Sequence, residues 1–297
     1  MLEAREDRVH WGEKQEGSVK DREAGGNILV VGFDPHPELL IQWGLSDNVT
    51  GARSMCSRLI EACVDTVKMI KPQSAFFERF GSRGIALLED VIAEAKQAGL
   101  AVLLDAKRGD IGSTMRAYAE AYMDPQSPLA VEALTVSPYL GMESLQPAFA
   151  LSQDTGTRLF ILALTSNSGA SRFQHARPGT SPAGTSVASE VIAAVERENQ
   201  RLGHSQHGVV IGATIGDVLS DLHIDIAASD MPVLAPGFGA QGAELEDFHR
   251  VFGQAFTRGQ VLIPMSRAII SAGPNVHDVS DVIRRYTRSI GRELSLR

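Results

Sequence analysis

Three ionisable side chains follow directly after one apolar run, and their spacing suits catalysis. The run is residues 100–104, which is typical of a buried β-strand. Because residues i and i+2 of a strand point to the same face, we expect Asp105 and Lys107 to project together, with Asp110 on the following loop. Such an acid–ammonium–acid cluster is costly unless it does chemistry, so it is the first candidate for a catalytic site. The alternative is a salt-bridged helix start, with Asp110 near the N-terminus of a helix that runs from Thr114.

The composition predicts a cytoplasmic globular protein. The chain has 297 residues, of which 43% are hydrophobic and 22% charged, enough for a well-buried core. The net charge is −8 and no block of Lys and Arg stands out, so neither nucleic acid nor a membrane surface is an expected partner. No apolar run reaches the roughly 18 residues of a membrane span, and residues 1–27 are unlike a secretory signal. Cys56 and Cys63 are expected to be reduced core thiols rather than a disulfide or a metal site.

Short apolar runs recur along the chain and alternate with segments of helical periodicity. Residues 84–98 repeat apolar side chains at helical spacing, and Gly99 is placed to end that helix. Residues 186–202 show the same pattern. The expected strands are residues 28–33, 66–70, 100–104, 130–136, 158–164, 208–211, 231–235 and 260–264.

Eight strands that alternate with helices over about 250 residues predict a (β/α)₈ barrel, an α/β fold. We expect one barrel domain over residues 28–297, preceded by a polar extension over residues 1–27. A doubly wound open sheet is the alternative, but the turn after the first run, residues 34–37, lacks the glycines usual there. Residues 165–184 are rich in Ser, Gly and Pro, and we expect them to form a structureless lid or binding loop.

In such a barrel, chemistry should gather at the carboxyl ends of the strands. Polar residues follow six of the eight runs. Taken alone, Asp34 could be an ordinary turn residue and Lys71 a solvated lysine at a helix start; together with the others they predict one site. The residues concerned are Asp34, Lys71, Asp105, Lys107, Ser166, residues 236–242, Ser266 and Arg267.

The residues after the seventh and eighth runs suit a phosphate. Gly237, Gly239 and Gly242 allow backbone N–H groups to approach an anion closely. Arg267 can offer a planar set of donors to phosphate oxygens. The last two loops of these barrels frequently bind phosphate, so we expect a phosphate monoester as substrate. A plain tight turn and a surface arginine are the alternative interpretation.

Taken in order, these segments resemble the orotidine 5′-phosphate decarboxylases, which form UMP in pyrimidine biosynthesis, and in particular the longer bacterial branch called type 2. The resemblance covers about residues 28–290. The Asp-x-Lys-x-x-Asp core alone is shared with relatives of other activity, so the whole set in order is what makes the resemblance specific. The matching segments are residues 33–40, 71–78, 105–114, 137–141, 236–242 and 266–269.

The resemblance implies a role for each matching residue. Lys71, Asp105, Lys107 and Asp110 would form the alternating charged tetrad of the family. Asp110, Ile111 and Thr114 would complete the pocket of a partner subunit, which implies a homodimer with shared active sites. The substrate-binding residues implied are Asp34 and Thr114 at the ribose, Ser166 at the pyrimidine edge, and Gln241 and Arg267 at the phosphate, with Pro236, Gly237, Gly239 and Gly242 in the same loop.

The resemblance also implies a reaction, the loss of CO₂ from C6 of orotidine 5′-monophosphate without a metal or cofactor. Lys107 would protonate C6, because neighbouring carboxylates favour the charged form of an amine. The same ammonium would stabilise the negative charge that develops where water is excluded. Asp105 would lie near the departing carboxylate, where it either destabilises that group or only orients Lys107. Phosphate binding could lower the barrier by closing residues 165–184 over the ring.

Two other functions stay open on the sequence. Mg²⁺-dependent sugar-phosphate decarboxylases and aldolases share the Asp-x-Lys-x-x-Asp core, although Lys71 and Ser166 argue against them. A non-catalytic nucleotide-phosphate-binding barrel would not need Lys107. A serine hydrolase is disfavoured because the chain has no Gly-x-Ser-x-Gly motif, and the spacing of metal ligands is absent as well.

Overall fold

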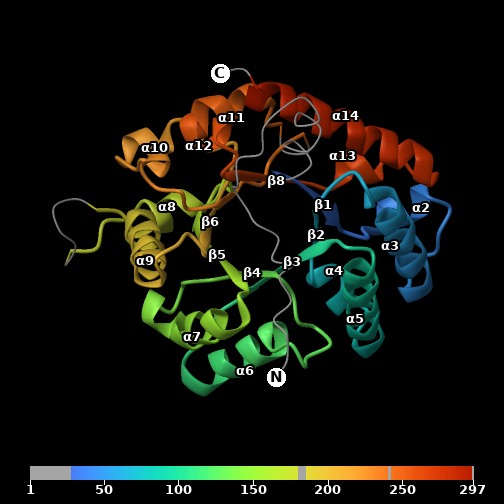
Figure 1. Ribbon diagram of the computed structural model, residues 1–297, viewed down its shortest axis with the longest axis horizontal. Helices are drawn as coiled ribbons and strands as arrows, with labels where there is room; N and C mark the ends of the chain where they lie inside the picture. The colour runs from blue at the N-terminus through green and yellow to red at the C-terminus, as the bar shows by residue number, and fades with distance from the viewer. Residues whose placement is uncertain (1–27, 180–184, 240–241, 296–297) are drawn as a thin grey trace, which may run out of the picture.

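The structure is a closed barrel of eight parallel strands. This computed structural model describes residues 28–179, 185–239 and 242–295. Each strand pairs with the next in chain order and the last pairs with the first (Figure 1), so the predicted (β/α)₈ barrel is confirmed and the open sheet is excluded. The strands are β1 (Leu29–Phe33), β2 (Met69–Pro72), β3 (Ala101–Arg108), β4 (Ala133–Val136), β5 (Arg158–Leu164), β6 (Gly208–Ile211), β7 (Val233–Leu234) and β8 (Val261–Met265).

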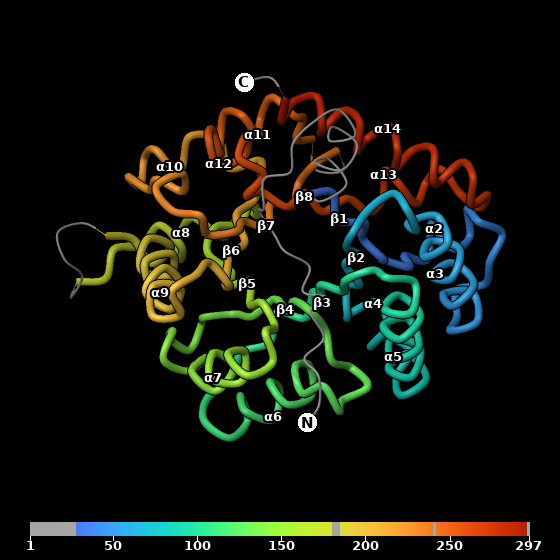
Figure 2. The backbone as a smooth tube through the Cα atoms, viewed as in Figure 1, coloured from blue at the N-terminus to red at the C-terminus, as the bar shows by residue number. Residues whose placement is uncertain are grey.

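The helices form an outer ring around the strands, with α6 and α7 on the side opposite α14 (Figure 2). Most strand residues are apolar and buried because the helices cover the outer face of the sheet and the barrel interior covers the other. The helices are α2 (Pro37–Gln42), α3 (Val49–Cys63), α4 (Ala75–Glu78), α5 (Ser82–Gln97), α6 (Gly112–Met123), α7 (Gln146–Thr155), α8 (Ala170–Gln174), α9 (Val187–Leu202), α10 (Val218–Asp221), α11 (Leu245–Phe252), α12 (Gln254–Thr257), α13 (Arg267–Ile270) and α14 (Val276–Ser295), with short 3₁₀ turns at η1 (Met142–Leu145) and η2 (Ile226–Ala228).

Two boundaries differ from the expectation in ways that affect the site. β3 continues to Arg108, past the predicted end at Leu104, because Arg108 still pairs with Val136 of β4 after a register shift. Residues 165–184 are not structureless, since α8 lies within them; residues 180–184 lie outside the described part. The predicted polar extension, residues 1–27, also lies outside the described residues.

The core and the cysteines follow the expectation. Cys56 and Cys63 are buried, unpaired thiols on the inner face of α3, and burial raises the pKa of both. In the part of the chain that the structure describes, no helix has both the length and the apolarity to span a membrane.

A close approach between β1 and β8 brings two strand ends to the same place. A Cβ atom added to Gly32 would lie 2.6 Å from the Cβ of Ser266, so a larger residue does not fit without movement. Glycine therefore allows the first and last strands to meet, and the side chains that follow each of them share one end of the barrel.

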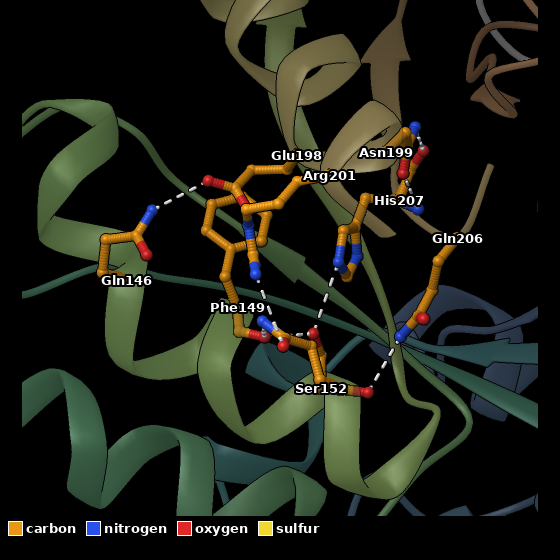
Figure 3. A network of polar contacts seen from close by, with 9 residues as sticks. Gln146, Phe149, Ser152, Glu198, Asn199, Arg201, Gln206 and His207 are labelled. Carbon is orange, nitrogen blue, oxygen red and sulfur yellow. Dashed lines mark hydrogen bonds and ion pairs between the residues drawn. The ribbon is translucent and has the colours of Figure 1, made fainter. Parts of the chain in front are cut away.

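A buried polar network joins α7, α9 and β6 on the outside of the barrel (Figure 3). The Nδ1 atom of His207 accepts a hydrogen bond from the backbone N–H of Leu159 at 3.2 Å, so the ring proton is on Nε2, which lies 3.3 Å from the hydroxyl of Ser152. Asn199 holds the backbone N–H and C=O of His207 with two bonds of 2.8 Å, and the ring packs edge-on against Phe149. The network therefore requires a neutral histidine.

We expect acid to destabilise the protein through His207. Burial lowers the pKa of this ring to about 4, against 6.5 when exposed. The folded state binds a proton at His207 less readily than the unfolded state does. The contribution of neutral His207 to the free energy of unfolding is therefore complete above pH 6.5 and is lost as the pH falls to about 4. This loss amounts to roughly 3 kcal/mol. Urea unfolding at a series of pH values measures this loss.

The matched comparison is between two histidines of the same loop. His207→Gln should lower stability at pH 8 but remove most of the pH dependence between 6.5 and 4, whereas the exposed His204→Gln should leave the dependence intact. An unchanged dependence in His207→Gln would show that other groups cause the acid sensitivity.

Candidate active site

A cavity of about 380 Å³ opens at the carboxyl ends of the strands, a size that suits a small molecule. Its walls come from most strands and their following loops, as expected for this fold. The lining residues with polar side chains are Asp34, His36, Lys71, Gln73, Asp105, Lys107, Thr135, Thr165, Ser166, Asn167, Ser266 and Arg267.

Two ammonium groups flank one carboxylate on the floor of the cavity. The Nζ atom of Lys71, on β2, donates to Oδ2 of Asp105 at 3.0 Å. The Nζ atom of Lys107, on β3, donates to the other oxygen, Oδ1, at 2.5 Å. The charges thus alternate along a row, as the sequence predicted for Asp105 and Lys107.

Burial and charge oppose each other in the inner pair. Burial alone would raise the pKa of Asp105, but the charges of Lys71 and Lys107 hold it well below its ordinary value. Burial alone would lower the pKa of Lys71, yet Asp105 and Asp34 raise it on balance. The inner pair is therefore ionised at neutral pH.

Lys107 is the most exposed member of the row. Its side chain is 44% exposed, whereas those of Lys71 and Asp105 are 9% and 12% exposed. Its backbone lies in the left-handed region, with φ of 48°, which few residues with a side chain adopt. Such strain is typical of functional positions, and here it accompanies the irregular end of β3.

The opposite part of the cavity can hold an anion. Arg267 begins α13 and lines the cavity together with Pro236, Gly237 and Phe238 from the loop after β7. Gly239 and Gly242 lie outside the lining, and their N–H groups already donate to Ala243 and Gly239 within the loop. The sequence led us to expect that Gly237, Gly239 and Gly242 all bring N–H groups to an anion, but Gly239 and Gly242 use theirs to shape the loop. Gln241 lies outside the described residues.

Two buried oxygen atoms of the cavity have no hydrogen-bond partner among the described residues. They are Oδ1 of Asp34, at the end of β1, and Oγ of Ser266, at the end of β8. Buried polar atoms are normally paired, so unpaired ones that line a cavity are candidates to bind a polar ligand.

The loop after β5 brings Ser166 to the cavity, and a residue of α8 holds the start of this loop. Gln174 accepts a hydrogen bond from the backbone N–H of Thr165 and donates one to its hydroxyl, both at 2.8 Å. Ser166 and Asn167 follow directly and line the cavity. A residue of the short helix thus holds the end of the strand in place.

Three predicted site residues lie away from the cavity of their own chain. Asp110, Ile111 and Thr114 are absent from its lining, and Ile111 is 62% exposed. Asp110 accepts a hydrogen bond from the N–H of Ile111 at 2.8 Å, at the start of α6. Within one chain, the structure therefore brings together three members of the predicted tetrad and not the fourth.

Sequence reasoning missed several residues that line the cavity. Thr135, on β4, is the most informative, because it is 1% exposed and contacts both Asp105 and Lys107. The signal was a polar residue near the carboxyl end of an apolar run, which the barrel rule marks as a site position. His36, Gln73 and Asn167 were also missed.

Comparison with known proteins gives consistent matches over most of the chain. The family model "Orotidine 5′-phosphate decarboxylase / HUMPS family" matches residues 27–282. An orotidine 5′-phosphate decarboxylase from Streptomyces coelicolor is 48% identical over 266 residues, which are 88% of this chain and 91% of the relative. One from Salinispora arenicola is 50% identical over 251 residues, which are 84% and 86%. A crystal structure from Streptomyces avermitilis, assigned as an orotidine 5′-phosphate decarboxylase, has a TM-score of 0.84 at 44% identity, and covers 97% of this chain and 100% of that chain.

Proposed function

The chain belongs to the orotidine 5′-phosphate decarboxylase family, and we propose that this carboxy-lyase of pyrimidine biosynthesis converts orotidine 5′-monophosphate to UMP and CO₂ with Lys107 as the proton donor. The observation that carries the proposal is the row Lys71, Asp105 and Lys107, whose outer ammonium opens onto the cavity. Arg267 lines the same cavity, so a phosphate and a reacting carbon can occupy one ligand-sized space.

The proposed step exchanges one carbon substituent for a proton. The bond between C6 and the carboxylate breaks, CO₂ leaves, and the electron pair stays on C6. Lys107 gives its proton to C6, and the resulting neutral amine regains a proton from water. The ammonium also stabilises the charge that develops on C6, because it is already held in place and needs no reorganisation.

Asp105 supports this step in two ways. It accepts a hydrogen bond from Lys107, which limits the positions that the ammonium can take. Its negative charge also attracts the Lys107 ammonium, so the two groups stay in contact. Lys71 keeps the carboxylate ionised from the buried side, so the inner pair serves as a fixed support for the outer ammonium.

The remaining cavity residues support the binding of a nucleoside monophosphate. Arg267 suits the phosphate, since a guanidinium can make paired hydrogen bonds to phosphate oxygens. The unpaired Oδ1 atom of Asp34 suits a ribose hydroxyl. Ser166 suits the edge of the pyrimidine ring. It follows β5, which lies across the barrel from β1 in the strand order.

We further propose a homodimer in which Asp110, Ile111 and Thr114 complete the cavity of the partner subunit. This placement gives a role to three residues that do not line their own cavity. Exposed apolar side chains on neighbouring loops support an interface at the same end of the barrel. They are Ile111, Tyr139, Leu140 and Phe173, and the rings of Tyr139 and Phe173 are in contact.

A shared site predicts that two inactive variants restore one another. In a heterodimer of Lys107→Ala and Asp110→Ala, one site has both defects and the other has neither. Random pairing makes half of the dimers heterodimers, so an equal mixture should recover about a quarter of wild-type activity. No recovery, despite subunit exchange confirmed by mass spectrometry of labelled subunits, would place Asp110 outside the partner's site.

The function itself is tested by the ultraviolet absorbance of orotidine 5′-monophosphate. Purified protein should consume this compound and form UMP, and EDTA should leave the rate unchanged. No turnover under conditions in which the protein is folded would contradict the proposal. Strong inhibition by EDTA would instead favour the Mg²⁺-dependent sugar-phosphate enzymes.

A further inference from the structure

A single hydroxyl group connects the backbone of Lys107 to the carboxylate of Asp105. Thr135 Oγ1 accepts a hydrogen bond from the backbone N–H of Lys107 at 2.9 Å. The same hydroxyl donates to Oδ1 of Asp105, also at 2.9 Å. Because Oδ1 also accepts from Nζ of Lys107, the contacts form a closed ring of backbone, hydroxyl, carboxylate and ammonium.

The ring lies where the backbone is strained. Lys107 has φ of 48°, and the pairing of β3 with β4 shifts register between Leu104 and Arg108. A backbone N–H at such an irregularity has no regular partner in the sheet, and a buried N–H requires one. Thr135 supplies that partner from β4, so the threonine satisfies the donor that the irregular strand end would leave unpaired.

The hydroxyl also determines which lysine bonds to each oxygen of the Asp105 carboxylate. Its one proton goes to Oδ1, the oxygen that faces Lys107, while Oδ2 receives Lys71 at 3.0 Å. A carboxylate without this third contact could rotate about its bond to Cβ and exchange its partners. Thr135 thus holds both the residue that donates the hydrogen bond, through the backbone N–H of Lys107, and the Asp105 carboxylate that accepts it.

An ordinary core threonine would look different. Thr157 and Thr287 are buried like Thr135, but their hydroxyls donate only to backbone carbonyl groups, those of Val131 and of Ile283 and Arg284. The hydroxyl of Thr135 instead donates to the carboxylate of Asp105 and accepts from the backbone N–H of Lys107, so both hydrogen bonds link it to residues of the charged row. Its contacts therefore indicate a role in the site rather than in the fold.

We propose that Thr135 is a positioning residue, whose hydroxyl aims the Lys107 ammonium by holding its backbone N–H and its carboxylate partner together. The inference rests on the proposed function, since it assigns to Lys107 the proton that reaches C6. It requires no contact between Thr135 and the substrate.

The test compares variants that differ only in the hydroxyl. Thr135→Val keeps the shape and should lower kcat by about 10–100-fold, because small displacements of a reacting group are costly. The Kd of UMP should stay within about threefold, since the hydrogen bonds of the hydroxyl are made to Lys107 and Asp105. Thr157→Val is the matched control in the same fold and should keep wild-type kcat.

A second pair guards against a change in folding. Thr135→Ser and Thr135→Ala both lack the methyl group, and they differ from each other by one oxygen atom. Serine should restore most of the wild-type kcat while alanine behaves like valine, with circular dichroism and Tm measured for each. The positioning role is wrong if the wild type and the three Thr135 variants have equal kcat, or if Thr135→Ser is as slow as Thr135→Ala. An inactive wild-type protein would instead contradict the proposed function, so the two failures can be told apart.

Discussion

Lys107→Ala should lower kcat for orotidine 5′-monophosphate by about 10⁴-fold or more, because proton donation and charge stabilisation are lost together. The alanine leaves Asp105 paired with Lys71 at 3.0 Å, so the buried pair survives and the protein should stay folded. Binding of UMP should change by less than about tenfold, since the ammonium acts on a charge that forms only during the reaction. Single-turnover kinetics and UMP titration measure the two effects.

The control for this variant is an exposed lysine at the opposite end of the barrel, outside the cavity lining. Lys68 is exposed just before β2, and Lys68→Ala should retain wild-type kcat. If Lys107→Ala keeps more than about a tenth of the wild-type rate, Lys107 is not the proton donor, because general acid catalysis alone exceeds that factor.

Asp105→Asn should affect both catalysis and stability. The neutral amide keeps the shape, but it removes the charge that holds both ammonium groups, so kcat should fall by about 10²–10³-fold. The pKa of Lys71 should fall, because its burial is no longer opposed by this carboxylate. Since Lys71 then lies buried beside an uncharged amide, the free energy of unfolding should drop by about 3–5 kcal/mol.

A surface ion pair provides the comparison for Asp105→Asn. Asp90 pairs with Arg53 on the helices, and both side chains are about half exposed. Asp90→Asn should cost less than about 1 kcal/mol and leave kcat unchanged, because water screens an exposed pair. Equal stability losses in the two variants, by urea unfolding, would mean that the Asp105 pair is not a buried electrostatic unit.

The sequence predicts the barrel well because its signals are periodic and local. The fifth and sixth strands, residues 158–164 and 208–211, match their predicted bounds. The end of β3 was predicted four residues early, because its last residues are mostly charged and no local pattern shows that Arg108 pairs with Val136 of β4. The helix α8 was missed because it has only five residues within a segment rich in turn residues, and no local pattern shows the hydrogen bonds between Gln174 and Thr165 that hold it.

The site was predicted as far as residue type and position at a strand end allow. Asp105 and Lys107 follow from i, i+2 spacing, and Lys71 from the barrel rule, and the structure brings these three together. Thr135 was missed because a single threonine in an apolar strand looks like core, and only the register between β3 and β4 places its hydroxyl against the charged row. The expectation for Gly239 and Gly242 did not anticipate that the loop would use their N–H groups itself.

The central claim is that Lys107 delivers a proton to C6, and a crystal structure tests it most directly. The wild-type protein would be crystallised with a UMP analogue that carries an anionic oxygen on C6. The account predicts that Nζ of Lys107 lies within about 2.6–3.2 Å of that oxygen, with Asp105 still bonded to the same ammonium. A separation beyond about 5 Å, or a different side chain in contact with that oxygen, would contradict it.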